Sequence, residues 1–419
     1  MNPSLKGNPH PRGVASSETA REINRDVLLH SVHCHQPVSR ADLARLSGLQ
    51  PSTVSVIVGQ LIDEGWVVPG EQGRLPRGRR PTYIKLNDRH VTLGIDLRPD
   101  NVHMALIDIN GNLLARETVP LAASQHTDED LRQLLQQIAQ TARTLRSTAS
   151  DLRFDGVGVS VSGRVAPESH RMLFSPNAPW IQADLCAELE RALGMPVEME
   201  NAANACLYGE RWFGQLGQSS HVLVVSVADG IGTGLLIDGR LLRGRDGMAG
   251  EFGHMTLEEG GPTCACGNRG CWEVFASNRA ALRYYREFSS GNEVASFTQL
   301  LGLAKDGDLQ ALRAIDRMTQ YIGRGLAILS AGLAPETILV VGDCTTLWPR
   351  ILPLLESQLI AKAIRPCTPK LIAATDGGIA RLRGAAALVF HKLLFRHSEL
   401  GQPISIAEEH TDAVLPAWN

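Results

Sequence analysis

The sequence has no long uninterrupted run of apolar residues and no apolar segment near its N-terminus. Hydrophobic residues make up 43% of the 419 residues, enough for a real core, yet no stretch approaches the roughly 18 consecutive apolar residues that a membrane-spanning helix needs. The first residues, MNPSLKGNPHPRG, lack the apolar core of a secretory signal. We therefore expect a cytoplasmic protein of two or three domains without membrane insertion. Residues 1–18 should form a disordered arm and 398–419 a C-terminal tail.

The cysteines are too scattered for a disulfide scaffold, which favours a reducing compartment. Three of the eight nevertheless cluster with a histidine, because His254, Cys264, Cys266 and Cys271 lie within eighteen residues. Two thiols separated by one residue, with a third five positions on, are typical of a tetrahedral zinc site with three cysteines and one histidine. Since four protein ligands fill the coordination shell, we expect a structural zinc ion (Zn2+) rather than one that activates water.

The same stretch carries a longer pattern, Glu251-x-Gly-His254 followed by Cys264-x-Cys266-Gly-x-x-Gly-Cys271-x-Glu273. This pattern resembles the signature of the ROK family, a name that joins repressors, open reading frames and sugar kinases. The resemblance covers nearly all of residues 90–395 and implies an actin-like body of two lobes, preceded in some members by a DNA-binding domain. Alternation of apolar strands with helical segments over the same residues also favours an α/β body. We expect lobe 1 at 89–203 plus 377–397, and lobe 2, with the zinc site, at 204–376.

The N-terminal segment differs from the body in charge. Residues 1–90 hold 12 Lys and Arg against 8 Asp and Glu, whereas the remainder holds 29 against 36, which suggests a terminal module that meets an anion. Residues 21–47 predict two helices, the second opened by a capping box at Ser39, and Pro51 starts a third helix that stops at Gly65. The expected apolar face of the first helix is Ile23, Val27 and Leu28.

A basic hairpin follows these helices. Two helices around a tight turn, followed by a hairpin with an arginine-rich tip, predict a winged helix-turn-helix domain over residues 19–88, as the resemblance to ROK repressors also implies. Small polar groups near the start of the third helix are suited to base edges and phosphates. The predicted DNA contacts are Ser39, Arg40, Gln50, Ser52, Thr53, Ser55, Arg74, Arg77, Arg79 and Arg80. A small helical interaction domain with a solvated basic loop is the alternative interpretation.

Two positions that the family's sugar kinases need are altered. Their glycine loop, Asp-x-Gly-Gly-Thr, holds the phosphates of ATP, and the same place here reads Asp96-Leu-Arg98-Pro99-Asp100. Proline removes a backbone donor and the carboxylate of Asp100 would repel phosphate, although Arg98 offers a positive charge. In the kinase motif Glu-Asn-Asp-x-Asn the aspartate is the general base, whereas this chain has alanine, Ala202, at that position. We therefore expect no catalytic residues and no enzyme activity.

The positions that contact the sugar in the family are retained. The resemblance assigns effector binding to Asn201, Glu251, His254 and Glu273. Carboxylates suit sugars because each accepts two hydroxyl hydrogens. His254 would use one ring nitrogen for zinc and present the other to the ligand or to a supporting group. The run Asp229-Gly-Ile-Gly-Thr-Gly234 is either the family's second glycine loop or a tight hairpin turn between strands.

Together these features predict a sugar-responsive transcriptional regulator, most simply a repressor of carbohydrate genes. Its partners would be double-stranded operator DNA and a sugar or sugar phosphate bound between the lobes. We expect a homodimer or homotetramer, because two-fold symmetry doubles the contact with a palindromic site. Two alternatives stay open: a ROK sugar kinase with an appended DNA-binding domain, and a regulator controlled by a protein partner from sugar transport.

Overall fold

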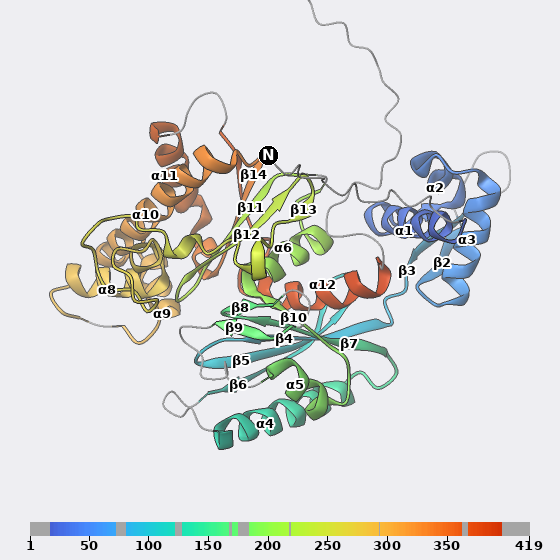
Figure 1. The fold of residues 1–419 in the computed structure, drawn as a ribbon, viewed down its shortest axis with the longest axis horizontal. Helices are drawn as coiled ribbons and strands as arrows, with labels where there is room; N and C mark the ends of the chain where they lie inside the picture. The colour runs from blue at the N-terminus through green and yellow to red at the C-terminus, as the bar shows by residue number, and fades with distance from the viewer. Residues whose placement is uncertain are drawn as a thin grey trace, which may run out of the picture. The chain divides into compact units, whose positions relative to one another are not determined.

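The computed structural model divides the chain into two compact units, with the boundary between Asn87 and Asp88 (Figure 1). None of the helices in the described part of the chain is long and apolar enough to cross a membrane. The residues that the structure describes are 17–72, 81–121, 128–166, 170–174, 184–217, 219–292, 294–362 and 368–395.

The N-terminal unit contains three helices and a small antiparallel sheet. The helices are α1 (Ser17–His35), α2 (Arg40–Ser47) and α3 (Pro51–Asp63). The strands, in the spatial order β1-β3-β2, are β1 (Val38–Ser39), β3 (Thr82–Leu86) and β2 (Val67–Gln72). The hairpin of β2 and β3 therefore follows the three helices, as the sequence predicts.

Local sequence signals account for the helix limits in this unit. The capping box at α2 is present, since the Ser39 side chain accepts from the Asp42 N–H and the Asp42 carboxylate accepts from the Ser39 N–H. Gly48 ends α2 at φ 68°, a conformation that strongly favours glycine. The apolar stripe of α3 is buried, with Val54, Val58 and Leu61 each 0% exposed.

The predicted apolar face of α1 needs one correction. Val27 and Leu28 are buried as expected, but Ile23 is 45% exposed. The buried face continues instead toward the C-terminal end, through Leu29 and Val32. Ile23 lies one turn before the part of α1 that packs on its neighbours. It therefore has the spacing of the apolar face, but the prediction that it is buried is wrong.

The second unit is built on two five-stranded sheets of the same topology. In the first, the spatial order is β10-β7-β4-β5-β6, and in the second it is β15-β14-β11-β12-β13. In both, three sequential strands form antiparallel hairpins and two further strands add in parallel. The first sheet consists of β4 (His90–Leu97), β5 (Asn101–Asp108), β6 (Leu113–Pro120), β7 (Arg153–Val161) and β10 (Val197–Asn201). The second consists of β11 (Val222–Val227), β12 (Ile231–Ile237), β13 (Arg240–Leu241), β14 (Thr337–Val341) and β15 (Lys370–Ala373).

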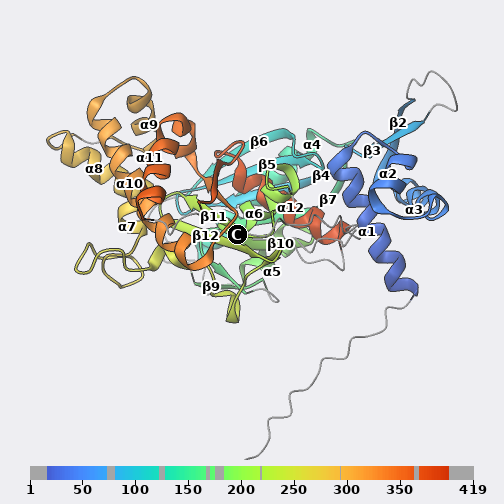
Figure 2. The same cartoon turned by 90° about the horizontal axis from the view of Figure 1, so that it is seen from above.

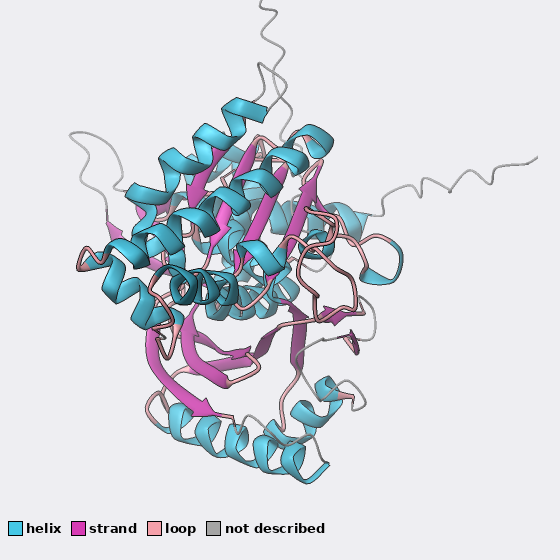
Figure 3. Cartoon of the chain, turned by 90° about the vertical axis from the view of Figure 1, so that its left-hand side faces the viewer, coloured by secondary structure: helices cyan, strands magenta, loops and turns pink. Residues whose placement is uncertain are grey.

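Helices cover both faces of each sheet (Figure 3). On the outer face of the first sheet lie α4 (Asp128–Ser147) and α5 (Leu185–Leu193), and on that of the second lie α7 (Glu273–Ala276), α8 (Asn278–Phe288), α9 (Phe297–Lys305), α10 (Leu309–Leu333) and α11 (Trp348–Lys362) (Figure 2). Between the sheets, α6 (Ala202–Phe213) packs against α12 (Ala380–Leu394). Repetition of one sheet topology around a central helix pair defines two lobes.

The central helix pair packs unusually closely, and glycine makes this possible. A Cβ on Gly384 of α12 would lie 2.3 Å from the Ala205 carbonyl oxygen of α6. A Cβ on Gly158 of β7 would lie 1.8 Å from the carbonyl oxygen of Ala385. A side chain at Gly384 would push α12 away from α6, and one at Gly158 would push it away from the first sheet, so both glycines are required by packing rather than by their own backbone angles.

The glycine run after β11 resolves into a turn and a strand. Val227 pairs with Ile231, and Ala228 N–H donates to the Gly230 carbonyl at 3.0 Å, so Asp229 and Gly230 form a tight hairpin turn. Residues Ile231–Ile237 then form β12, so the strand that follows the turn begins inside the glycine run. The turn also borders the cavity described below, so the two interpretations of this run are compatible.

Candidate functional site

The four predicted zinc ligands lie together on a compact knuckle. His254 ends the short 3-10 helix Phe252–His254, and isolated bridges pair Thr256 with Cys271 and Thr263 with Arg269. The backbone can turn back between the last two cysteines because Gly267 and Gly270 have φ values of 93° and 70°. At Gly270 a side chain is also sterically excluded, because its Cβ would lie 1.8 Å from the carbonyl oxygen of Glu258.

The donor atoms have the spacing of a tetrahedron around zinc. The ligand atoms of His254, Cys264, Cys266 and Cys271 all lie within 4.8 Å of one another. Cys266 Sγ is 3.7 Å from Cys271 Sγ, and Cys264 Sγ is 3.6 Å from His254 Nδ1. With Zn–S bonds of about 2.3 Å and Zn–N bonds of about 2.0 Å, the edges of a tetrahedron are about 3.8 Å between two sulfurs and about 3.6 Å between sulfur and nitrogen. The donor set therefore fits a closed, structural zinc site.

Burial and a neighbouring carboxylate favour the neutral form of two of these thiols. Burial raises the pKa of Cys264 and of Cys271, and neighbouring Glu273 adds to the rise at Cys264. Cys264 Sγ donates a hydrogen bond to Glu273 Oε1 at 2.8 Å, so this carboxylate stabilises the neutral thiol. A divalent cation would reverse the shift, since it stabilises the thiolate directly.

A cavity of about 960 Å3 opens between the two lobes, beside this knuckle. The first lobe contributes Asn201 and the β4–β5 turn to its lining, and the second contributes the β11–β12 turn and the start of the knuckle. All four predicted effector residues, Asn201, Glu251, His254 and Glu273, line this cavity. The structure thus brings together residues that are up to 72 positions apart in the sequence.

The orientation of His254 links the knuckle to the cavity. Its Nδ1 lies 3.6 Å from Cys264 Sγ, one of the predicted ligands, and 3.5 Å from Glu273 Oε1. Its Nε2 lies 3.8 Å from Glu251 Oε2 on the cavity side. A metal bound at Nδ1 would fix the ring, and with it the position of Nε2 between Glu251 and any ligand. The sequence analysis expects this division, with one ring nitrogen of His254 for zinc and the other for the ligand or a supporting group.

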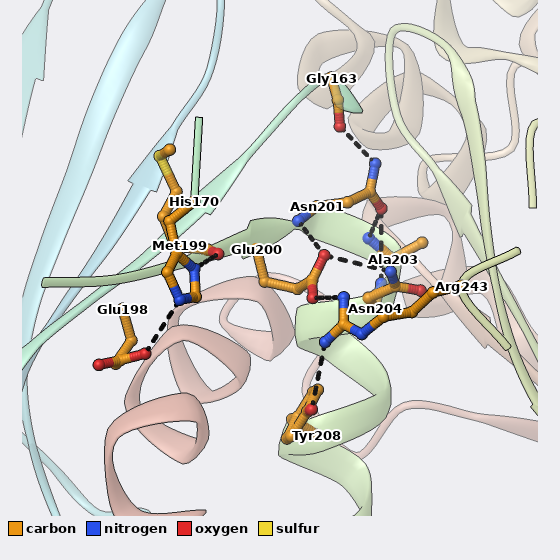
Figure 4. A network of polar contacts seen from close by, with 10 residues as sticks. All are labelled: Gly163, His170, Glu198, Met199, Glu200, Asn201, Ala203, Asn204, Tyr208 and Arg243. Atoms are coloured by element: carbon orange, nitrogen blue, oxygen red, sulfur yellow. Dashed lines mark hydrogen bonds and ion pairs between the residues drawn. The ribbon is translucent and has the colours of Figure 1, made fainter. Parts of the chain in front are cut away.

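Asn201 has a structural task that the sequence did not reveal. Its Oδ1 accepts from Ala203 N–H at 2.8 Å and caps the N-terminus of α6, and its Nδ2 donates to the Gly163 carbonyl at 2.6 Å (Figure 4). The acceptor of the amide is therefore occupied, although the residue borders the cavity. Any ligand contact from this side chain would use the remaining amide hydrogen. Its predicted effector contact stays a prediction.

A buried ionic network supports the same wall. Glu200 is 4% exposed, and its carboxylate accepts from Asn201 N–H, Asn204 Nδ2 and Arg243 Nη1 (Figure 4). Burial by itself lowers the pKa of Arg243, but the charges and hydrogen bonds of Glu200 and Tyr208 together outweigh this effect and the net pKa is raised. The sequence analysis did not identify Arg243, because its partner lies more than forty residues away and no local pattern signals the pair.

The altered glycine loop is also occupied by an ionic network. Arg98 Nε donates to Asp96 Oδ2 at 2.7 Å, and Arg381 Nε, from α12, lies 2.9 Å from Asp96 Oδ1. Arg381 Nη2 donates to Ser162 Oγ at 3.0 Å. Arg98 is thereby held by a carboxylate in the β4–β5 turn. Ala202, at the expected general-base position, borders the cavity with no carboxylate of its own.

The N-terminal unit presents part of the predicted DNA-binding surface. Gln50, Ser52 and Ser55 are exposed at the start of α3, and Arg40 and Thr53 are partly exposed. Ser39 is different, since it is 5% exposed and its hydroxyl bonds the Asp42 carboxylate at 2.6 Å. Its side chain belongs to the helix cap, which corrects its place among the predicted contacts. The four wing arginines, Arg74, Arg77, Arg79 and Arg80, lie outside the described residues.

Two lobes of equal topology around a cavity with a Cys3His knuckle define the class as an actin-like α/β protein with a ligand cleft between its lobes. The ROK family model matches residues 92–392. The xylose repressor of Bacillus spizizenii is 31% identical over 350 residues, which cover 83% of this chain and 89% of the repressor. The chain belongs to the ROK family.

Two solved structures separate the two branches of this family. A crystal structure of a ROK family transcriptional regulator, described as a homolog of the E. coli MLC protein, aligns with a TM-score of 0.73 and 25% identity, over 90% of this chain and 98% of that one. The ROK glucokinase of Streptomyces griseus, in complex with glucose and AMPPNP, aligns with a TM-score of 0.62 and 29% identity, over 71% of this chain and 98% of that one. The regulator thus matches a larger share of this chain than the glucokinase does.

Proposed function

We propose that this protein is a sugar-responsive transcriptional repressor that binds operator DNA through its N-terminal unit and a sugar or sugar phosphate between its lobes. One observation carries the proposal: a helical unit with a β-hairpin precedes a cleft that keeps Glu251, His254 and Glu273 but has an ionic network in place of the kinase phosphate loop. The larger matched share of the regulator structure supports the same choice.

The DNA-binding surface would be the start of α3 together with the hairpin of a winged helix-turn-helix. Gln50, Ser52 and Ser55 share an exposed face with Val56, whose side chain is 59% exposed. An exposed valine beside small polar residues is suited to the methyl group of thymine in the major groove. We therefore add Val56 to the proposed contacts and remove Ser39. The arginines between β2 and β3 would meet the backbone or the minor groove.

The effector would act through the lobes. Glu251 and Glu273 approach the cavity from the second lobe, while the network of Glu200, Asn204 and Arg243 holds the wall beside α6. A ligand that contacts both walls favours a closed arrangement of the lobes over an open one. In a homodimer or homotetramer, that change would alter the spacing of the DNA-binding units on a palindromic site.

Zinc would be a structural part of this arrangement. His254, Cys264, Cys266 and Cys271 would hold the ion, and the ion would in turn fix the loop that carries Glu251 and Glu273. Because four protein donors fill the shell, it supplies rigidity and no reactive position.

The experiment that tests this function is fluorescence anisotropy of the protein on its own upstream DNA, titrated with sugars and sugar phosphates at fixed salt. Tight binding that one ligand releases supports the repressor and identifies the effector class. Failure to bind that DNA specifically would contradict the proposal. Tight binding that no sugar changes would favour control by a protein partner, which a pull-down from sugar-fed and starved cells would detect.

A sugar kinase with an appended DNA-binding domain is the second candidate, favoured by the glucokinase alignment over 71% of the chain. The Asp96–Arg98 pair and Ala202 argue against it, since the phosphate loop and the general base are both replaced. We expect no ADP release above background from Mg-ATP with common hexoses and pentoses, in an assay where a ROK glucokinase is active. Turnover with any of these sugars would favour the interpretation as a sugar kinase.

A further inference from the structure

A second group of metal-binding side chains lies near the end of α1, in the N-terminal unit. His30, His33 and Cys34 each offer one ligand atom, and these atoms lie within 4.8 Å of one another. We propose that these three residues form a divalent-metal site of the zinc type, separate from the knuckle and specific to the N-terminal unit.

The helix itself brings the three donors together. Positions three and four residues apart lie on the same face of a helix, so His30 is next to both His33 and Cys34. Cys34 Sγ is 3.5 Å from His30 Nε2 and 3.9 Å from His33 Nδ1. These distances bracket the edge of about 3.6 Å between sulfur and nitrogen around a tetrahedral zinc ion.

The position on the helix favours a cation. His30, His33 and Cys34 occupy the last two turns of α1, which ends at His35. Carbonyl groups at a helix C-terminus carry partial negative charge, so a positive ion there is stabilised. Two imidazoles and one thiolate form a donor set that binds Zn2+. Softer and borderline metals that compete with zinc bind the same donor set.

Exposure determines what kind of site this is. Cys34 is exposed, and His30 and His33 are partly exposed, so the ion would face solvent on one side. Three protein ligands leave the fourth position to water, in contrast to the closed shell of the knuckle. Binding requires neutral imidazoles and a thiolate, so Cys34 would release its proton to solvent as the metal binds. We expect this ion to be held more weakly than the one in the knuckle.

For the fold, metal binding would crosslink the C-terminal end of α1. The bound ion would join two turns of the helix directly before β1 and the cap of α2, the segment that leads into the DNA-binding helices. Metal would therefore stabilise the N-terminal unit and leave the body unchanged.

The test is the stoichiometry of metal binding by the full chain. Cobalt is titrated into metal-free protein and followed by its absorption, and zinc content is measured after gel filtration. We expect two metal ions per chain in the wild type, and one in His30→Gln and in Cys34→Ser. The ion that is lost should have the weaker affinity and the weaker charge-transfer band of a single thiolate.

His35→Gln provides the matched control, since His35 is on the same helix but outside the group, with Nδ1 3.0 Å from the Ser31 carbonyl oxygen. It should keep two ions.

A second measurement uses the wild-type chain alone. Zinc should slow the alkylation of Cys34 by iodoacetamide at least tenfold. Saturation at one ion per chain, unchanged binding in both variants, or unaltered alkylation would each overturn the proposal.

Discussion

Asp96 and Arg381 form a buried ion pair between the first strand and the last helix of the body. Arg381 Nε lies 2.9 Å from Asp96 Oδ1, and the two residues are 5% and 1% exposed. The two atoms are close but not aligned as a hydrogen bond, so the attraction is mainly electrostatic. Burial lowers the pKa of Arg381, and the Asp96 charge offsets part of that effect. The same carboxylate therefore contacts two guanidinium groups, because Arg98 Nε donates to its other oxygen.

Asp96→Asn should destabilise the body strongly, because it removes the carboxylate that contacts both Arg98 and the buried Arg381. We expect the free energy of unfolding in urea to fall by about 3 to 5 kcal/mol, the range for breaking a buried pair. The control is Asp316→Asn, since Asp316 binds Arg350 through two hydrogen bonds of 2.7 and 2.6 Å but at the surface. That loss should cost less than about 1 kcal/mol. Equal effects of the two substitutions would show that burial of the Asp96 pair is unimportant.

Cys266→Ser should remove the zinc ion of the knuckle. The metal content of the chain is expected to fall by one ion, with a loss of about 4 kcal/mol or more in stability. Cys186→Ala tests whether any cysteine change has this effect, because Cys186 is buried far from the knuckle in the first lobe. It should keep the zinc. Unchanged metal content in the Cys266 variant would refute the knuckle site.

Glu251→Gln should weaken the response to the effector without changing DNA affinity. A hydrogen bond from a sugar hydroxyl to a charged group contributes about 1.5 to 3 kcal/mol, so the concentration for half-maximal release should rise about tenfold or more. The anisotropy titration measures this shift. Glu259→Gln is the matched control, since Glu259 is exposed nearby but does not line the cavity. An identical response of both variants would mean that Glu251 does not contact the ligand.

Replacing Arg77, Arg79 and Arg80 together by alanine should weaken DNA binding on every sequence. If each contacts a phosphate, the slope of log affinity against log salt should decrease by nearly 3 in magnitude, at about 0.9 per contact. Three exposed arginines of the body, Arg132, Arg143 and Arg191, give a variant with the same change in net charge. A similar slope for the two triple variants would make the wing assignment untenable.

His391 should make the body sensitive to acid. Its ring packs at 5.2 Å from Tyr208 and 5.6 Å from Phe395, and burial lowers its pKa to about 4. The folded state therefore keeps the ring neutral while the unfolded chain, with a pKa near 6.5, takes up a proton. This contribution to stability is complete above about pH 6.5 and is lost as the pH falls toward 4, by up to about 3 kcal/mol.

His391→Phe removes the titrating ring and keeps an aromatic side chain. Urea unfolding at pH 7 and pH 4.5 should then show a smaller acid loss in the variant than in the wild type, by about 2 to 3 kcal/mol. Zinc release in acid affects both proteins alike, so the difference isolates His391. Parallel pH profiles would exclude the histidine as a source of acid sensitivity.

Local patterns were enough to predict the features that depend on nearby residues. The capping box at Ser39, the start of α3 at Pro51 and the four knuckle ligands follow from spacings of a few residues, which fix what can meet within one turn or one loop. The loss of the kinase loop and base could likewise be predicted, because each is a substitution within a short motif. The strands of the body were visible as apolar runs.

Tertiary structure decided everything that depends on contacts between distant segments. The sequence predicted Ser39 both as a helix cap and as a DNA contact, and its burial in the folded N-terminal unit leaves only the cap. Asn201 retained a family position, yet the proximity of Gly163 and α6 determines what its amide can bind. The pairs Glu200–Arg243 and Asp96–Arg381 have no sequence signal at all. Buried charges must find partners wherever the fold brings them, and only the packed chain shows which partners those are.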